Sequence, residues 1–401
     1  MALSLAIIII LGLVFNRAFD KLRLPGLLGM LILGVLIGPY GISLINEDVL
    51  RISPDLRKIA LIVILLRAGL GIKKETLSKV GVPAIKMSII PVLLEGFTIT
   101  FIARSLLNIS FIEAGMLGFI VAAVSPAVVV PQMLNLIEKN KGKVKGIPTL
   151  ILAGASIDDV LAITIFSTFL GFFSGSKVSL TWKVLNIPIS IILGVVLGIV
   201  TAIFLIYLFK KLHIRDTKKA LLILSLSIFL TSLEDILQSI IPIASLVGVM
   251  TIGFVLLERY EVVGKRLASK FNKIWVFAEL ILFVLVGAEV NIHVAIDSGL
   301  IGLLIIGLGL MARSIGVIIS LMGTELNYKE RVFCVISYVP KATVQAAIGA
   351  TPLAVGVPSG DIILAIAVLA IIITAPLGAA GIKIAGENWL KSYPDEKAPQ
   401  I

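Results

Sequence analysis

The chain has 401 residues, of which 58% are hydrophobic and 15% are charged, and its mean hydropathy is +1.11. A soluble globular domain does not carry this much apolar surface, so the composition indicates an integral membrane protein. A single cysteine, Cys334, excludes an internal disulfide and any metal site built from several cysteines. The two histidines, His213 and His293, supply few metal ligands or catalytic bases.

Apolar runs of about 20 residues, separated by Pro, Gly and charged clusters, predict thirteen membrane spans. The first run has no basic segment before it, so we expect a span and not a cleaved signal peptide. Only the turn around Pro242 separates the eighth span from the ninth. The predicted spans are 2–16, 26–45, 58–72, 84–107, 114–137, 147–173, 184–209, 220–238, 241–258, 274–292, 296–321, 332–355 and 361–384.

Lysine and arginine alternate sharply between successive loops: one set of loops holds 22 of them and the opposite set holds four. By the positive-inside rule the basic set is cytoplasmic, which places the N-terminus outside and the C-terminal tail inside. Topology therefore explains the net charge of +11, and no nucleic-acid partner is expected. The basic loops are 17–25, 73–83, 138–146, 210–219, 259–273 and 322–331.

Prolines interrupt two predicted spans in a similar way, at Ser125-Pro126 in the fifth and at Pro340-Lys341 in the twelfth. Because proline removes a helix donor and clashes with the preceding turn, both spans are expected to unwind near mid-membrane. The fourth to sixth and eleventh to thirteenth spans then form an inverted repeat, where transporters place their ion sites. Each break taken alone has a simpler explanation, since proline also kinks membrane helices without a function.

Two adjacent carboxylates, Asp158 and Asp159, lie midway along the apolar stretch 146–173. An ionised carboxylate in hydrocarbon costs roughly 2.5–3.5 kcal/mol on insertion scales, so such residues are rare and usually functional. Neighbours on a helix point about 100° apart, so one aspartate can hold a cation or proton while the other pairs sideways.

Further oxygen atoms are expected near these aspartates. Ser156 and Thr164 belong to the same span, and the broken fifth span frees main-chain carbonyls around Val124 and Ser125. Hard monovalent cations such as Na⁺ prefer such donors, so the sequence predicts a cation- and proton-binding site with both aspartates as Na⁺ ligands. The alternative is a neutralised structural pair that is hydrogen-bonded to the backbone.

Buried basic residues need anionic partners in the same spans. Arg313 in the eleventh span is expected to pair with Asp158 or Asp159, and its guanidinium cannot release a transported proton. Glu95 in the fourth span and Lys341 in the twelfth form a second candidate pair. Lys341 has an equally open alternative role, which is to neutralise the dipole ends of the broken helix.

Three other charged residues lie nearer to predicted span ends. Arg67 in the third span is a candidate gating residue, with snorkelling toward one membrane face as the alternative. Glu279 and Glu289 flank the tenth span, and we expect both to be solvated end charges.

Several of these stretches resemble the cation:proton antiporter superfamily, with the closest likeness to its NHA-type sodium/proton exchangers. The likeness runs from about residue 25 to residue 385. The aspartate-pair and Ser-Pro stretches together make it specific. The matching stretches are RAGLGI at 67–72, Glu95, AVSPAVVVPQML at 123–134, GIPTLILAGASIDDVLAIT at 146–164, GAEV at 287–290, Arg313 and PKATVQAAIG at 340–349.

The resemblance implies a core domain with two crossed broken helices that moves against a dimerisation domain in a homodimer. It implies Asp159 as the main carrier of cation and proton, with Asp158 paired to Arg313. The implied segments are 1–83 and 210–292 for dimerisation, 84–173 and 293–385 for transport, 174–209 as a linker helix and 386–401 as a cytoplasmic tail. The remaining implied assignments are backbone around Val124 and Ala155 near the ion, and a pair of Glu95 with Lys341.

These features together predict a Na⁺ or Li⁺:proton antiporter of the cell (inner) membrane that works by alternating access, with no cofactor. Electrogenic relatives have a lysine where Arg313 falls, and an arginine that stays paired with Asp158 favours electroneutral exchange. K⁺/H⁺ exchange and Na⁺-coupled symport of an organic anion remain alternatives. An intramembrane aspartyl protease is disfavoured because adjacent aspartates diverge, and a serine protease because neither histidine lies within a span.

Overall fold

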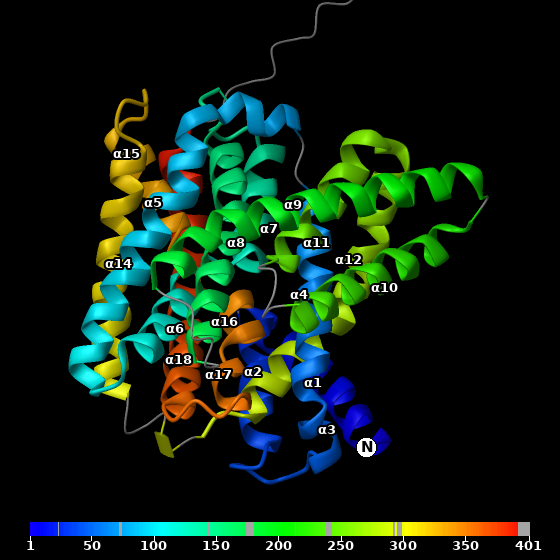
Figure 1. The fold of residues 1–401 in the computed structure, drawn as a ribbon. Coiled ribbons are helices and arrows are strands. Elements are labelled where there is room, and N and C mark those ends of the chain that lie inside the picture. The colour runs from blue at the N-terminus through cyan, green and yellow to red at the C-terminus, as the bar shows by residue number, and fades with distance from the viewer. Residues whose placement is uncertain are drawn as a thin grey trace, which may run out of the picture. The chain divides into compact units, whose positions relative to one another are not determined.

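The computed structural model is mostly helical in the part of the chain that it describes, with seventeen helices and no strand there (Figure 1). Each of the thirteen predicted spans contains a helix, so the prediction of an all-helical membrane fold is confirmed. The structure describes residues 1–22, 24–71, 74–142, 144–173, 180–212, 214–237, 243–291, 293–294 and 299–391.

The chain divides into two compact units, each assembled from distant parts of the sequence. Unit 1 comprises residues 1–74, 164–292 and 350–361, and unit 2 comprises 75–163, 293–349 and 362–401. The roles that we expect for the segments in dimerisation, linkage and transport stay predictions. The predicted linker helix packs against α11 within unit 1.

Unit 1 is built from helices that pack closely through glycine. A Cβ atom at Gly34 would lie 2.1 Å from the Val284 carbonyl oxygen, and one at Gly287 would lie 2.1 Å from the Leu31 carbonyl oxygen. Helices in lipid gain no hydrophobic driving force from one another, so such small-residue contacts hold them together. The helices of unit 1 are α1 (Ala2–Lys21), α2 (Gly26–Ile37), α3 (Glu47–Arg51), α4 (Ser53–Gly69), α9 (Leu180–Lys211), α10 (Asp216–Leu237), α11 (Ser245–Arg259), α12 (Glu261–Ala288) and α17 (Thr351–Ala354).

Unit 2 contains both broken spans, as the prolines predict. The fifth span is α6 followed by α7, the twelfth is α15 followed by α16, and Ser125 N in the first break donates to Pro340 O in the second at 2.8 Å. Helices α6 and α15 both begin with a capping box, Ser110 with Glu113 and Asn327 with Glu330. The helices that lie wholly or mostly in unit 2 are α5 (Lys74–Leu107), α6 (Phe111–Ala122), α7 (Pro126–Glu138), α8 (Ile147–Phe173), α14 (Gly299–Ser320), α15 (Tyr328–Ser337), α16 (Thr343–Ile348) and α18 (Gly360–Trp389).

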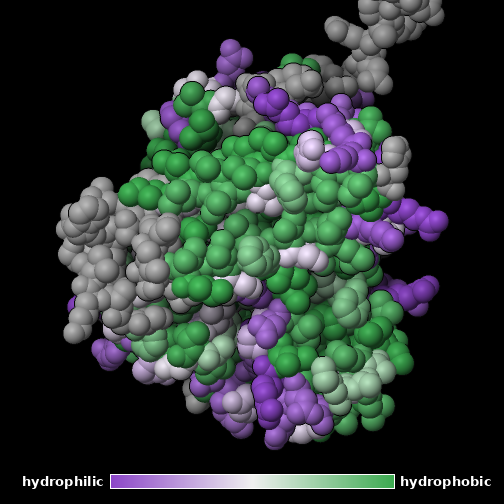
Figure 2. Space-filling model, turned by 45° about the vertical axis from the view of Figure 1, so that its right-hand side comes forward, coloured by the Kyte–Doolittle hydropathy of each residue, from purple (hydrophilic) through white to green (hydrophobic). Residues whose placement is uncertain are grey.

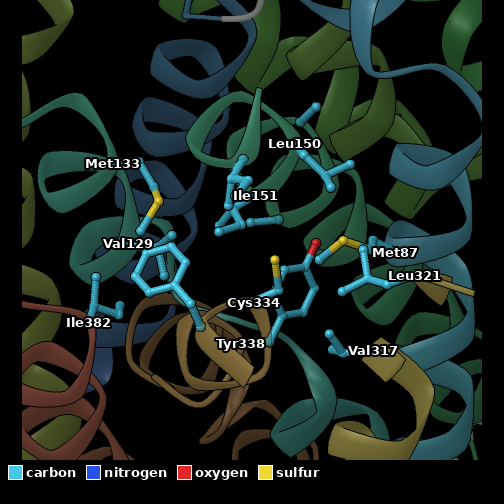
Figure 3. Close-up of a cluster of buried hydrophobic side chains, with 14 of the residues drawn as sticks. Met87, Val129, Met133, Leu150, Ile151, Val317, Leu321, Cys334, Tyr338 and Ile382 are labelled. Carbon is cyan, nitrogen blue, oxygen red and sulfur yellow. The ribbon is translucent and has the colours of Figure 1, made fainter. Parts of the chain in front are cut away.

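A cluster of buried apolar side chains fills the interior of unit 2 (Figure 3). Its members come from α5, α7, α8, α14, α15 and α18, so residues far apart in the sequence share one core. Cys334 and Tyr338 lie one turn apart at its α15 side. The cluster connects the two halves of the repeat.

The predicted loop at 259–273 is wrong. Helix α12 begins at Glu261, thirteen residues before the span that we expect there. Two basic side chains of this run are paired: Arg266 Nε donates to Asp216 Oδ2 at 2.7 Å, and Lys265 lies 2.6 Å from Glu261. The hydrogen bond from Arg266 also lowers the pKa of the Asp216 carboxyl.

Two other predicted boundaries also differ from the structure. The second span ends at Ile37 and is followed by the short α3. Helix α5 begins ten residues before the predicted fourth span and kinks at Gly81, where φ is 49°. The predicted turn between the eighth and ninth spans falls on residues 238–242, which lie outside the described residues.

Six of the described helices are long and apolar enough to cross a membrane: Ala2–Lys21, Gly81–Leu107, Ile189–Lys211, Glu261–Ala288, Gly299–Ser320 and Gly360–Trp389. The two broken spans cross only as pairs of shorter segments. Figure 2 shows hydrophobic side chains over much of the visible surface, with hydrophilic ones gathered in separate zones. This surface matches a chain embedded in lipid.

The close contact of α2 with α12 gives a stability prediction. Gly287→Val would push a side chain into the Leu31 carbonyl, so we expect a loss of about 1–3 kcal/mol and a lower melting temperature in detergent. Gly307→Ala on α14 is the control, because its added Cβ would meet nothing within 4 Å. Equal melting temperatures for the two variants would contradict this close contact of α2 with α12.

Candidate functional site

The aspartate pair lies in the middle of α8, within unit 2. Asp158 is fully buried and Asp159 is 5% exposed. Asp158 Oδ2 accepts a hydrogen bond from Val124 N at 3.0 Å and lies 3.4 Å from Arg313 Nη2. Asp158 is therefore held by the first helix break on one side and by α14 on the other.

Arg313 makes a second, closer contact with Glu95 on α5. Its Nε donates to Glu95 Oε2, and the guanidinium lies 5.6 Å from the centre of the Tyr338 ring. Arg313 is 1% exposed and Glu95 is fully buried. Because a guanidinium presents five donors in a rigid fork, it can hold Glu95 and Asp158 at once.

Lys341 completes the set of charges. Its Nζ donates to the same Glu95 oxygen at 2.7 Å and lies 3.4 Å from the Ala122 carbonyl oxygen at the end of α6. Both contacts expected from the sequence are present, but they are joined. Lys341, Glu95, Arg313 and Asp158 form one chain of two cations and two anions, which we call the charge cluster.

Asp159 adjoins the charge cluster but does not share its contacts. Its Oδ1 is buried and has no hydrogen-bond partner among the described residues. Nine buried side-chain atoms in the described part of the chain are unpartnered in this way, and six of them gather here. Buried polar groups are normally paired, and unpaired ones mark strain, function or bound water. The six atoms belong to Glu95, Asp158, Asp159, Arg313, Tyr338 and Gln345.

The other predicted ligands lie close to the break or to the aspartates. Val124 and Ser125 are fully buried, and Ser125 Oγ lies 3.5 Å from Thr343 Oγ1 of the second broken span. Ala155 is 1% exposed and lies one turn before the aspartates on α8. The side chain of Ser156 lies outside the described residues.

Tyr338 and Gln345 belong to the site although the sequence did not identify them. A Cβ atom at Gly154 would lie 2.0 Å from Tyr338 Oη, so the phenol packs against the α8 backbone one turn before Asp158. Gln345 Nε2 donates to carbonyl oxygens of α6 and its break. The sequence does offer one signal for Gln345: it is a polar residue in an apolar span, one helical turn after Lys341.

Arg67 lies in unit 1 and has partners there. Its Nε donates to Asn272 Oδ1 at 2.6 Å, and its guanidinium lies 6.0 Å from the centre of the Trp275 ring. The structure thus brings Arg67 together with α12, and a gating role for it remains a prediction.

Glu279 and Glu289 are not solvated end charges as expected. Glu279 is half-buried and lies nine residues before the end of α12. Glu289 lies 3.1 Å from Arg57, which is 2% exposed, and accepts a hydrogen bond from Ser53 at 2.7 Å. Because α4 begins at Ser53, Arg57 lies within a helix and is buried, whereas the sequence predicts a loop there.

Three comparisons with known proteins identify the family. The family model described as "Sodium/hydrogen exchanger, transmembrane" matches residues 5–386. The chain is 35% identical to human sodium/hydrogen exchanger 9B2 over 386 residues, covering 92% of this chain and 70% of the relative. It is 34% identical to human sodium/hydrogen exchanger 9B1, covering 93% of this chain and 74% of the relative.

The fold also matches a solved structure. The sodium proton antiporter MjNhaP1 from Methanocaldococcus jannaschii at pH 8 superposes with a TM-score of 0.84 and 21% identity, over 96% of this chain and 97% of that one. At this identity the likeness concerns the fold. Taken with the family match along nearly the whole sequence, it shows that the chain belongs to the transmembrane sodium/hydrogen exchanger family.

Proposed function

We propose that this protein exchanges Na⁺ or Li⁺ for protons by alternating access, with Asp159 as the carrier. One observation carries the proposal: Asp158 is engaged through its Oδ2 by Val124 and Arg313, whereas the side chain of Asp159 makes no hydrogen bond or ion pair among the described residues and its Oδ1 is buried. A carboxylate in a membrane interior requires a compensating cation. A proton or a Na⁺ ion supplies it in turn.

Charge balance favours electroneutral exchange. The charge cluster of Glu95, Asp158, Arg313 and Lys341 sums to zero when all four groups are ionised. Asp159 adds one negative charge, and either a proton or a monovalent cation cancels it. The loaded site then has the same net charge in both directions of transport, so the membrane potential does no work on the exchange.

Competition at one carboxylate also predicts pH dependence. A protonated Asp159 cannot bind Na⁺, so the apparent KM for Na⁺ should rise as the pH falls. Main-chain oxygens near Val124 and Ala155, and the hydroxyl of Ser125, are the candidate additional ligands. These are hard oxygen donors of the type that alkali cations prefer.

The topology and assembly expected from the sequence form part of the same proposal. The protein would lie in a cell membrane with its N-terminus outside and its C-terminus in the cytoplasm, since Lys and Arg gather in one set of loops. A homodimer is proposed from the family alone. K⁺/H⁺ exchange and Na⁺-coupled symport of an organic anion are the alternatives: the first would respond to K⁺, and the second would move no protons when Na⁺ is added.

Asp159→Asn should abolish exchange. Asparagine cannot take up a proton and carries no charge to hold Na⁺. The measurement is dequenching of a pH-sensitive dye in proteoliposomes after addition of Na⁺, Li⁺ or K⁺ to the unmodified protein and the variant. Asp55→Asn is the control, because Asp55 is exposed in the first turn of α4. A response to K⁺ alone would favour the K⁺ alternative, and an active Asp159→Asn would refute the assigned carrier.

Asp158→Asn should behave differently. The amide oxygen can still accept from Val124 N, but the charge cluster gains a net positive charge. We expect a higher apparent KM for Na⁺ and a lower melting temperature, because removing one partner of a buried ion pair costs about 3–5 kcal/mol. Full stability in this variant would contradict the role of Asp158 in holding α14.

Transport should be insensitive to voltage. In proteoliposomes clamped with K⁺ and valinomycin, we expect equal initial rates of Na⁺/H⁺ exchange at 0 mV and at roughly 100 mV of either sign, a potential worth about 2.3 kcal/mol per charge moved. A transport current under a Na⁺ gradient at symmetric pH would overturn the electroneutral assignment and leave the carrier role of Asp159 intact.

A further inference from the structure

The carbonyl end of α6 poses a problem that the aspartates do not solve. Helix α6 ends at Ala122, and the last four carbonyl oxygens of any helix have no partner within it. Residues 120–123 are all fully buried. With no water in the hydrocarbon region, these oxygens need donors from elsewhere in the protein.

Two side chains of the second broken span supply those donors. Gln345 Nε2 donates to the carbonyl oxygens of Ile120 and Ala123, each at 2.9 Å, and approaches that of Val121 at 3.3 Å. Lys341 Nζ donates to the remaining carbonyl oxygen, that of Ala122, at 3.4 Å. Every carbonyl from 120 to 123 therefore has a donor, and three of the four depend on one amide group.

The orientation of Gln345 indicates what its side chain does. Its Oε1 is buried and has no hydrogen-bond partner among the described residues, so the amide nitrogen makes all of the side chain's hydrogen bonds there. Burying an unpaired amide oxygen is costly. The side chain is thus used as a neutral donor, beside a lysine whose charge is already shared with Glu95.

Main-chain carbonyl oxygens are the ligands with which selective pores and ion sites replace the hydration shell of an alkali cation. Val124 follows directly after the last carbonyl that Gln345 takes, and its N–H is given to Asp158. The carbonyl of Val124 is the first in the break that neither Gln345 nor Lys341 takes. The carbonyl oxygens near the break therefore fall into two groups. Those of residues 120–123 are engaged by Gln345 or Lys341, and that of Val124 is available to a cation.

We propose that Gln345 is a positioning residue that sets cation selectivity: it binds the carbonyl end of α6 and so withholds these oxygens from the transported ion. The inference rests on the proposed exchange of cations at Asp159. Without the amide, three more neutral oxygens become available beside the site. A larger set of neutral ligands suits the larger K⁺ ion better than Na⁺ or Li⁺.

Gln345→Met tests this directly, because methionine has a similar length and no donor. In proteoliposomes we expect the ratio of the apparent KM for K⁺ to that for Na⁺ to fall at least threefold. Gln132→Met is the matched control: Gln132 Nε2 also donates to a carbonyl oxygen of unit 2, that of Ala379 at 2.9 Å, but on α7 and α18. Its KM ratio should not change.

A lower maximal rate with an unchanged KM ratio would reduce Gln345 to a structural role and overturn the inference, as would an equal change of the ratio in Gln132→Met. Gln345→Asn, which keeps the amide but shortens its reach, serves if the methionine variant does not fold. Thermal stabilisation by K⁺ against Na⁺ in detergent gives the same comparison without transport. Exchange that survives in Asp159→Asn would refute the assigned carrier, and an unmodified protein without cation-driven proton movement would refute the proposed function itself. Both outcomes are separate from an unchanged KM ratio in Gln345→Met.

Discussion

The rest of unit 2 depends on the ion pairs made by one carboxylate, that of Glu95. One of its oxygens accepts from both Arg313 and Lys341, so helices from both halves of the repeat meet at one atom. In hydrocarbon an unpaired charge is expensive, and a chain of alternating charges solves that problem for all four groups together. Asp158 belongs to this chain of charges, whereas the side chain of Asp159 beside it makes no hydrogen bond or ion pair among the described residues.

The same lack of water governs the two helix breaks. Proline opens each break. The second half of the repeat satisfies Ser125 N through Pro340 O and the carbonyl end of α6 through Gln345 and Lys341. Asp158, of the same half as the first break, satisfies Val124 N. An irregular backbone at membrane depth is tolerated only where protein groups or a water-lined cavity satisfy it. The breaks and the charge cluster are therefore one hydrogen-bonded assembly.

Much of this could be predicted from the sequence, because apolar length, proline and buried charge are strong local signals. They located the spans, both breaks and the residues of the charge cluster. The sequence did not reveal that Glu95 is shared, since pairing by charge alone allows several combinations. Gln345 escaped notice because a neutral amide carries no electrostatic signal. The early start of α12 was missed because a run of basic residues resembles a loop in the sequence. The partner of Arg266, Asp216, is distant in the sequence, so this pairing could not be seen there.

The apolar cluster of Figure 3 also affects how strongly the buried charges interact. The cluster reaches the charge cluster through Val124 and Tyr338, and Tyr338 packs against the α8 backbone at Gly154. Close apolar packing leaves little room for water, and a low local dielectric strengthens every interaction between the charges that it surrounds. The packing that gives unit 2 its core therefore also strengthens its ion pairs.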